Sequence, residues 1–195
     1  RCWVPWIFSY LCGVCALLSS LCVARWSTHR IEMIEYYNSD FNKSLGIVDI
    51  DMAHRKALPH YGVWVYVLNA AHKILLVRRS KHMKTCPNTW CIIGEHVDPA
   101  DSTWTDAVRR GLKEEIIEPL DIASLPVHLF GVESLQHQYE DGREDAQLSR
   151  RYYVVHPERL DFVTLHPSES DDRHGRFYDI AEVWQWLHDR PSEFC

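Results

Sequence analysis

The sequence predicts an α/β domain built in layers, preceded by an apolar N-terminal segment. Three observations predict this class. Several runs between residues 61 and 157 are rich in β-branched and aromatic residues, as strands are. Two stretches, 101–119 and 179–189, repeat apolar residues with helical spacing. The first segment, residues 2–24, carries no charge.

The composition fits a globular protein of modest charge. The chain has 195 residues, of which 46% are apolar and 25% are charged, enough for one domain with a sizeable core. The formal net charge is −6, which argues against an extended nucleic-acid-binding surface. A small phosphorylated ligand needs only a local basic patch and is compatible with this charge.

Residues 2–24 are long enough to cross a bilayer as one helix of about 35 Å. Tryptophans, which favour membrane interfaces, lie near both ends of this segment, at Trp3, Trp6 and Trp26. Two other interpretations stay open: a cleaved signal peptide, since Cys22 and Ala24 suit a cleavage site, or a buried helix of the domain. We expect the segment 1–26 to anchor the protein in a membrane, with the following domain on the cytoplasmic side.

Cysteine usage outside this segment is sparse. Only Cys86, Cys91 and Cys195 occur there, too few for a disulfide framework, which fits a reducing compartment. Residues 27–57 are weakly patterned, and we interpret them as a connector with one short helix. We expect the domain itself to span residues 58–190.

The first clear elements are two strands and a turn. Residues 61–69 are rich in β-branched and aromatic side chains and predict a strand. Residues 70–73 turn the chain, and residues 74–80 predict the hairpin partner of that strand. Residues 86–94 hold turn signals and then a short strand.

A helix is predicted over residues 101–119. Thr103 and Asp106 have the spacing of a capping box at its start, and Pro119 stops it. Gly111 lies in the middle of this helix, where glycine costs about 1 kcal/mol relative to alanine. Its presence there needs an explanation.

The last part of the chain predicts a hairpin and a second helix. Residues 125–139 and 146–157 are expected as strands, joined by a loop with an Asp-Gly turn signal. Asp179 can cap a helix over residues 179–189. The apolar stripe of that helix, which we expect to pack on the core, consists of Ile180, Val183, Trp184 and Leu187.

Two adjacent glutamates, Glu114 and Glu115, stand near the end of the helix at 101–119. Glu115 lies on the apolar side of the helix, so its carboxylate needs a partner, and a divalent cation is a suitable one. Arg110 precedes Glu114 by one helical turn and can pair with it. Gly111 would let a backbone or a ligand approach the helix closely. The alternative from these residues alone is a solvated helix end.

The strand, loop and helix around these glutamates resemble the signature of the Nudix hydrolases. That motif is Gly, five residues, Glu, seven residues, Arg-Glu, an aliphatic residue, any residue, Glu-Glu, any residue, Gly. Here "GEHVDPADS" at 94–102 leads to "AVRRGLKEE" at 107–115, and the strand "LLVRRS" and the turn "PNTW" precede them. The resemblance covers roughly residues 58–190 and implies an α/β/α sandwich with a mixed β-sheet.

The match departs from the motif at several positions. Glu95 stands where the first Gly is expected, and Asp101 stands for the first Glu. One extra residue lies between Asp101 and Arg110. Gly111 replaces the Glu that follows the Arg, and Ile117 replaces the final Gly.

The resemblance implies a Mg²⁺- or Mn²⁺-dependent hydrolase that cleaves a diphosphate linkage in a small molecule. Glu114 and Glu115 would bind the metal, together with the backbone carbonyl near Glu95. Arg110 and Glu115 are the catalytic candidates on the helix, and Asp101 would orient Arg110 or an outer-shell water.

Further candidates lie outside the motif. Arg78 or Arg79 could grip a phosphate through a guanidinium fork, or could guard an exposed strand edge. His96 could meet a phosphate or make a structural hydrogen bond. Glu169 is the candidate for the base, because members of the family often carry an acid in this region, and neighbouring acids compete with it for this role.

Two other functions stay open. The missing acid at position 111 favours a catalytically impaired Nudix-fold module that binds a ligand or a partner at a membrane. An isomerase of isopentenyl diphosphate shares the architecture and a similar helix, but Cys91 stands a few residues earlier than the cysteine that such isomerases need. The sequence does not define the oligomeric state.

Overall fold

A computed structural model describes residues 31–139 and 141–195. The apolar segment 2–24, and with it the predicted N-terminal helix, lies outside the described residues. Within the described part, no helix is long and apolar enough to cross a membrane. Residues Glu32–Cys195 form one compact unit.

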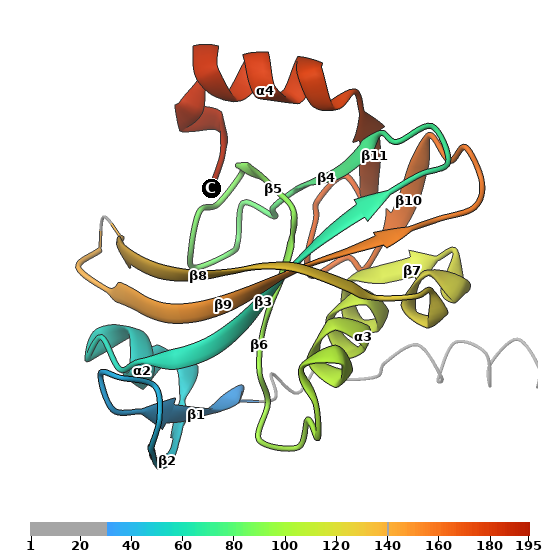
Figure 1. Ribbon diagram of the computed structural model, residues 1–195. Coiled ribbons are helices and arrows are strands. Elements are labelled where there is room, and N and C mark those ends of the chain that lie inside the picture. Colours follow the sequence, from blue (N-terminus) through green and yellow to red (C-terminus); the bar gives the residue numbers. More distant parts are fainter. Residues whose placement is uncertain (1–30, 140) are drawn as a thin grey trace, which may run out of the picture. The chain divides into compact units, whose positions relative to one another are not determined.

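The unit combines strands with three α-helices and two short 3-10 helices over the described residues (Figure 1). In chain order these are β1 (Met33–Tyr37), β2 (Ser44–Asp49), α2 (Ile50–Arg55), β3 (His60–Leu68), β4 (Ile74–Arg78), β5 (Trp90–Cys91), β6 (Ile93–His96), α3 (Trp104–Glu115), β7 (Ile116–Glu118), η1 (Leu120–Ser124), β8 (His128–Gln138), β9 (Glu144–Val155), β10 (Phe162–Leu165), β11 (His174–Tyr178), α4 (Ile180–Asp189) and η2 (Pro191–Glu193).

Strand β3 is the centre of the sheet. It pairs in parallel with β9 from His60↔Gln147 to Leu68↔Val155, and antiparallel with β1, β6 and β4. Strand β9 also forms the predicted antiparallel hairpin with β8. The sheet therefore contains both strand directions, which confirms the expected mixed sheet. Its inward side chains, among them Val63 and Val65, are 1% exposed and form the core.

The predicted hairpin of β3 and β4 exists only at its turn. Strands β3 and β4 pair at Leu68↔Ile74, after which β4 leaves β3 and pairs with β11 and β5. Four of the five residues of β4 are buried. The hairpin prediction is therefore confirmed at the turn and wrong along the rest of β4, where the partners are β11 and β5.

The stretch expected as a connector is more ordered than the sequence indicated. It contains the β1–β2 hairpin in addition to one short helix, α2. Ile34 of β1 is 1% exposed, and Tyr36 pairs with His60 of β3. The hairpin therefore attaches to the same central strand as the rest of the sheet.

Helix α3 begins as predicted and ends early. Thr103 and Asp106 form the capping box, with each side chain accepting a backbone N–H of the other residue. Ala107, Val108 and Leu112 are buried in the core. The helix ends at Glu115 rather than near Pro119, because the chain continues as strand β7, which pairs with β10.

Helices α3 and α4 lie on opposite sides of the strands (Figure 1). The apolar stripe predicted for α4 does not pack on the core: Ile180, Trp184 and Leu187 are 51%, 72% and 40% exposed. Another face of the helix turns inward, since the ring of Trp186 contacts Trp90 at a centroid distance of 5.4 Å. The stripe prediction for this helix was therefore wrong.

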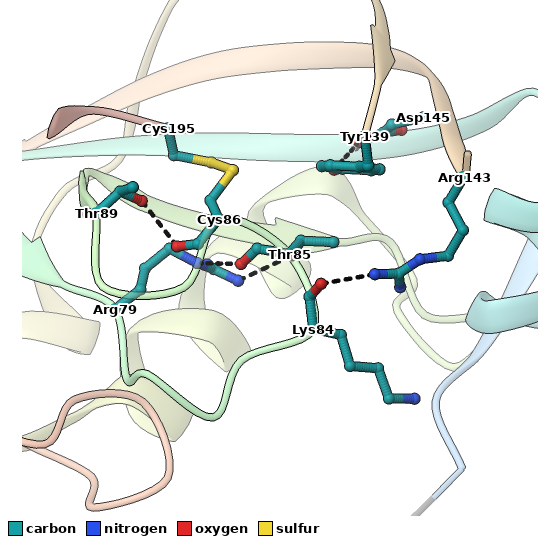
Figure 2. The surroundings of a disulfide bond; sticks show 9 residues. All are labelled: Arg79, Lys84, Thr85, Cys86, Thr89, Tyr139, Arg143, Asp145 and Cys195. Atoms are coloured by element: carbon teal, nitrogen blue, oxygen red, sulfur yellow. Dashed lines mark hydrogen bonds between the residues drawn. A yellow bond between two sulfur atoms is a disulfide. The ribbon is translucent and has the colours of Figure 1, made fainter. Parts of the chain in front are cut away.

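A disulfide that the sequence reasoning did not expect joins Cys86 to Cys195. It connects the loop after β4 with the last described residue (Figure 2). The backbone N–H of Cys195 also donates to the carbonyl of Trp90 at 3.0 Å. The tail after α4 is thus held against β5 by both a covalent and a hydrogen bond.

Leu112→Ala should lower the free energy of unfolding by about 2–5 kcal/mol, because it leaves a cavity between α3 and the sheet. Lys113→Ala, a change at the adjacent exposed position, should have little effect. Urea unfolding of both variants measures the difference. Equal stability of the two variants would contradict the packing of α3 described here.

Candidate functional site

Arg110, in the second turn of α3, joins the helix to the loop that precedes it. Its Nη2 donates to the carbonyl of His96 at 2.6 Å and lies 3.0 Å from Oδ2 of Asp101. Its Nη1 lies 3.2 Å from Oε2 of Glu95. Asp101 also accepts the backbone N–H of Asp98, so one carboxylate closes the loop and holds the arginine. This geometry agrees with an orienting role for Asp101, and its part in catalysis stays a prediction.

The two adjacent glutamates at the end of α3 point to different surroundings. Glu114 is exposed and pairs with Arg110 at 3.5 Å. Glu115 is only partly accessible. Burial raises the pKa of Glu115 well above its ordinary value, and the charges of Glu169 and Glu95 raise it further. The carboxylate of Glu115 is therefore the more shielded of the pair and lies among other acids.

The loop after β10 brings Glu169 to this place. The backbone N–H of His166 donates to the carbonyl of Glu115 at 2.8 Å, and Ser80 donates to the carbonyl of Glu169 at 2.8 Å. The Ser80 hydroxyl donates to Asp171 at 2.8 Å. The loop thus connects the end of α3 with the end of β4. Among the neighbouring charges, that of Glu169 raises the pKa of Glu115 most.

Arg78, the last residue of β4, and the next residue, Arg79, lie beside this loop. They line a small pocket of about 120 Å³ together with Asn88, Asp171 and Asp172. Arg79 donates from Nε to the carbonyl of Thr85 at 3.1 Å and from Nη2 to its hydroxyl at 3.0 Å (Figure 2). Its positive charge lowers the pKa of Glu115. The guanidinium that Thr85 holds in place therefore lies near the acids of the site.

Glu95, Glu114, Glu115 and Glu169, which we call the carboxylate group, therefore gather around the end of α3 with Arg79 as a nearby cation. Strand β6, the loop after β10 and helix α3 supply them. A model of the NUDIX domain matches residues 58–193. The chain belongs to the Nudix family. The match includes every residue that the sequence singled out as catalytic, substrate-binding or metal-binding.

Individual Nudix relatives are distant. An isopentenyl-diphosphate Delta-isomerase of Burkholderia multivorans is 25% identical over 154 residues, which is 78% of this chain and 81% of that protein. The crystal structure of DR0079 from Deinococcus radiodurans has a TM-score of 0.61 at 16% identity and covers 81% of this chain and 90% of that one. The NUDIX domain of Shewanella oneidensis NrtR, solved with ADP ribose, has a TM-score of 0.47 at 18% identity over 65% and 77% of the two chains.

A second set of ligand atoms in this Nudix chain was missed by the sequence reasoning. His54, His60 and His96, which we call the histidine group, each place a ring nitrogen within 4.8 Å of the other two. Asp145 of β9 lies 3.3 Å from Nε2 of His60. His54 belongs to the stretch interpreted as a connector, and no helical or zinc-like spacing relates it to His60, so the sequence gave no signal.

The histidine group has the properties of a cation site. The buried atoms Nε2 of His54 and Nε2 of His60 lie 4.0 Å and 3.3 Å from Oδ1 of Asp145, and none of the three meets hydrogen-bond geometry with any described residue. Burial lowers the pKa of His54 to about 4, so its imidazole is neutral and can donate a lone pair. Imidazole ligands suit Zn²⁺, Ni²⁺ and related ions. These residues therefore fit a metal ion.

His96 also faces the acids. Burial alone would lower the pKa of His96, but a 2.6 Å hydrogen bond with Glu32 outweighs it and raises the pKa to about 8. Glu32, Glu95 and His96 form another set whose ligand atoms lie within 4.8 Å of one another. Substrate binding by His96 stays a prediction.

The metal ligands expected from the motif are less tightly gathered. Over the described residues, Glu95 belongs to the set with Glu32 and His96, but Glu95, Glu114 and Glu115 together do not form a set whose ligand atoms all lie within 4.8 Å of one another. Glu114 turns toward Arg110 and solvent. A cation at α3 would therefore depend mainly on Glu115, with water or substrate oxygens in other positions.

Glu115→Gln should stabilise the metal-free protein at about pH 8 and have little effect at about pH 4. An acid with a raised folded-state pKa binds more protons when folded, so stability falls as the pH rises above the ordinary value of 4.5. Glutamine does not ionise, so the variant does not lose stability in this way as the pH rises. Urea unfolding in a chelator at both pH values measures it, with Glu118→Gln as the exposed control. An equal effect at both pH values would contradict a raised pKa.

His60→Gln should weaken Zn²⁺ or Ni²⁺ binding at least about tenfold, since even outer-shell partners of metal ligands contribute that much. Calorimetric titration of the metal-free protein measures the affinity. His188→Gln, at a side chain that is 79% exposed, is the matched control. If both variants bind these ions as the unchanged protein does, the histidine group is not a metal site.

Proposed function

We propose that this Nudix protein is a divalent-cation-dependent hydrolase that cleaves a diphosphate linkage in a small-molecule substrate. The observation that carries the proposal is the position of Glu115 at the end of α3: its carboxylate is partly buried, and it lies close enough to Glu169 and Glu95 for their charges to raise its pKa, with Arg79 as the nearby cation. Such a concentration of acids is stable only with protons or cations among them. A substrate diphosphate would bring its own negative charge to the same place.

Mg²⁺ or Mn²⁺ fits this chemistry because both prefer oxygen ligands. Glu115 would hold the cation, with Glu114 and the backbone carbonyl near Glu95 as further ligands. When bound, the cation would supply charge neutralisation of the diphosphate and an acidified water molecule.

The other side chains of the site would then have separate roles. Arg78 and Arg79, at the end of β4, would grip phosphate oxygens. Arg110, held by Asp101, would keep the 94–101 loop on α3 and so fix the ligand geometry. Glu169, beside Glu115, would accept a proton from the attacking water.

Glu115→Gln should reduce Mg²⁺-dependent hydrolysis by about 10²–10³-fold, because a metal ligand contributes several kcal/mol of transition-state stabilisation. The measurement is phosphate or nucleotide release from a panel of nucleoside diphosphate-linked compounds, with and without Mg²⁺. Glu118→Gln should keep the activity. Full turnover by Glu115→Gln would rule out this assignment of the metal ligand.

A second candidate function, isomerisation of isopentenyl diphosphate, is favoured by one observation. Burial raises the pKa of the Cys91 thiol to about 12, and this protonated thiol lies near Arg79, Glu115 and Glu169. A thiol beside a carboxylate can exchange protons with a substrate carbon. A relative at 25% identity carries the name of this isomerase. Including isopentenyl diphosphate in the panel, with Cys91→Ser as the variant, separates the two reactions.

The catalytically impaired binding module remains the alternative to both enzymes. It predicts saturable binding of a substrate from the panel, with no turnover under any metal. Residues 2–24 are our proposed membrane tether for either case. The Cys86–Cys195 disulfide favours an oxidising compartment for the domain, in place of the reducing compartment and the cytoplasmic side expected from the sequence. Alkaline extraction of membranes, with and without residues 2–24, tests the tether.

A further inference from the structure

Gly111 of α3 leaves a gap on the helix surface that Glu95 fills. A Cβ atom at position 111 would lie 3.0 Å from Cβ and 3.2 Å from Cγ of Glu95. Gly111 is buried, and a glycine in a helix interior weakens the helix relative to alanine. The gap, which we call the Gly111 notch, thus admits the stem of a side chain from another element.

Glu95 is fixed in this notch from both ends. Its backbone pairs with Val63 in the β3–β6 ladder. At its other end, Oε2 lies 3.2 Å from Nη1 of Arg110, and Oε1 accepts the backbone N–H of His96 at 2.8 Å. The side chain is 14% exposed. Its carboxylate therefore has one position, set before any ligand arrives.

That position is next to the acids of α3. Residue 111 precedes Glu115 by one helical turn, so a side chain lying over 111 is on the same face as Glu115. Glu95 raises the pKa of Glu115, and Glu114 is among the charges that raise the pKa of Glu95. The notch thus brings an acid from β6 to the place that an acid at position 111 would reach.

We propose that Glu95 and Gly111 are a matched pair, in which the side chain of Glu95 supplies a cation ligand that helix position 111 does not carry. This inference rests on the proposed function and extends it from the backbone carbonyl to the carboxylate of Glu95. It also accounts together for two departures from the Nudix pattern, an acid where glycine is expected and a glycine where an acid is expected.

The structural half of the pair is tested without metal. Gly111→Ala is made in the unchanged protein and in Glu95→Gly, and the unfolding midpoints form a double-mutant cycle. Alanine should raise the midpoint in the Glu95→Gly background, where the helix gains its propensity and the notch is empty. It should lower the midpoint when Glu95 is present. The same shift in both backgrounds would overturn the notch.

The ligand half is tested with Mg²⁺, which prefers oxygen ligands and so does not report on the histidine group. The apparent affinity is read from the rise of the unfolding midpoint with Mg²⁺ concentration. Glu95→Gln, which keeps the shape of the side chain, should weaken the affinity at least about tenfold. The exchanged variant, Glu95→Gly with Gly111→Glu, should return to within about threefold of the unchanged protein.

The outcomes distinguish this inference from the function on which it rests. If the unchanged protein does not respond to Mg²⁺, the proposed metal-dependent function fails, and the ligand role of Glu95 fails with it. If the unchanged protein and Glu95→Gln respond equally while Glu115→Gln does not, the function stands and the inference is overturned. Failure of the exchanged variant to recover, when it unfolds with normal cooperativity, also overturns it.

Discussion

The guanidinium of Arg110 is the interaction on which the site depends. It contacts the carboxylates of Asp101, Glu95 and Glu114 and the carbonyl of His96. Its positive charge therefore offsets much of the negative charge of these three acids. Glu115 lies beyond its reach. The carboxyl end of a helix also has a negative potential, which makes the end of α3 an unfavourable place for a carboxylate. The surplus of negative charge is therefore localised at Glu115, and a cation or a proton must meet it there.

The site is assembled from three parts of the chain that are distant in sequence. Strand β6 and helix α3 after it supply Glu95, His96, Glu114 and Glu115, the loop after β10 supplies Glu169, and the segment before β3 supplies Glu32 and His54. The ordered hairpin matters because β1 pairs with β3 at His60. The hairpin brings Glu32 into hydrogen-bond contact with His96 and so links the acidic residues to the histidine group. The two sets of ligand atoms meet at the adjacent residues Glu95 and His96.

Much of the fold could be predicted from local patterns, and the exceptions have physical causes. The capping box at Thr103 and the strand pattern of β3 are encoded in neighbouring residues, and both predictions were confirmed. The partners of β4 and the inward face of α4 depend on contacts between distant elements, such as Trp186 with Trp90. The disulfide belongs to the same class, since 109 residues separate its cysteines. For the site, residue identity pointed to Glu115 and Arg110, whereas His54 gave no local signal.

The contact between Glu95 and Gly111 has a consequence for the history of such chains. Because a side chain at 111 and the stem of Glu95 compete for one volume, neither position can drift alone without strain or an empty space. Descendants of a common ancestor should therefore change the two positions jointly. If Glu95 supplies the ligand as we propose, a letter-by-letter comparison of the helix would count as lost an acid that β6 provides instead.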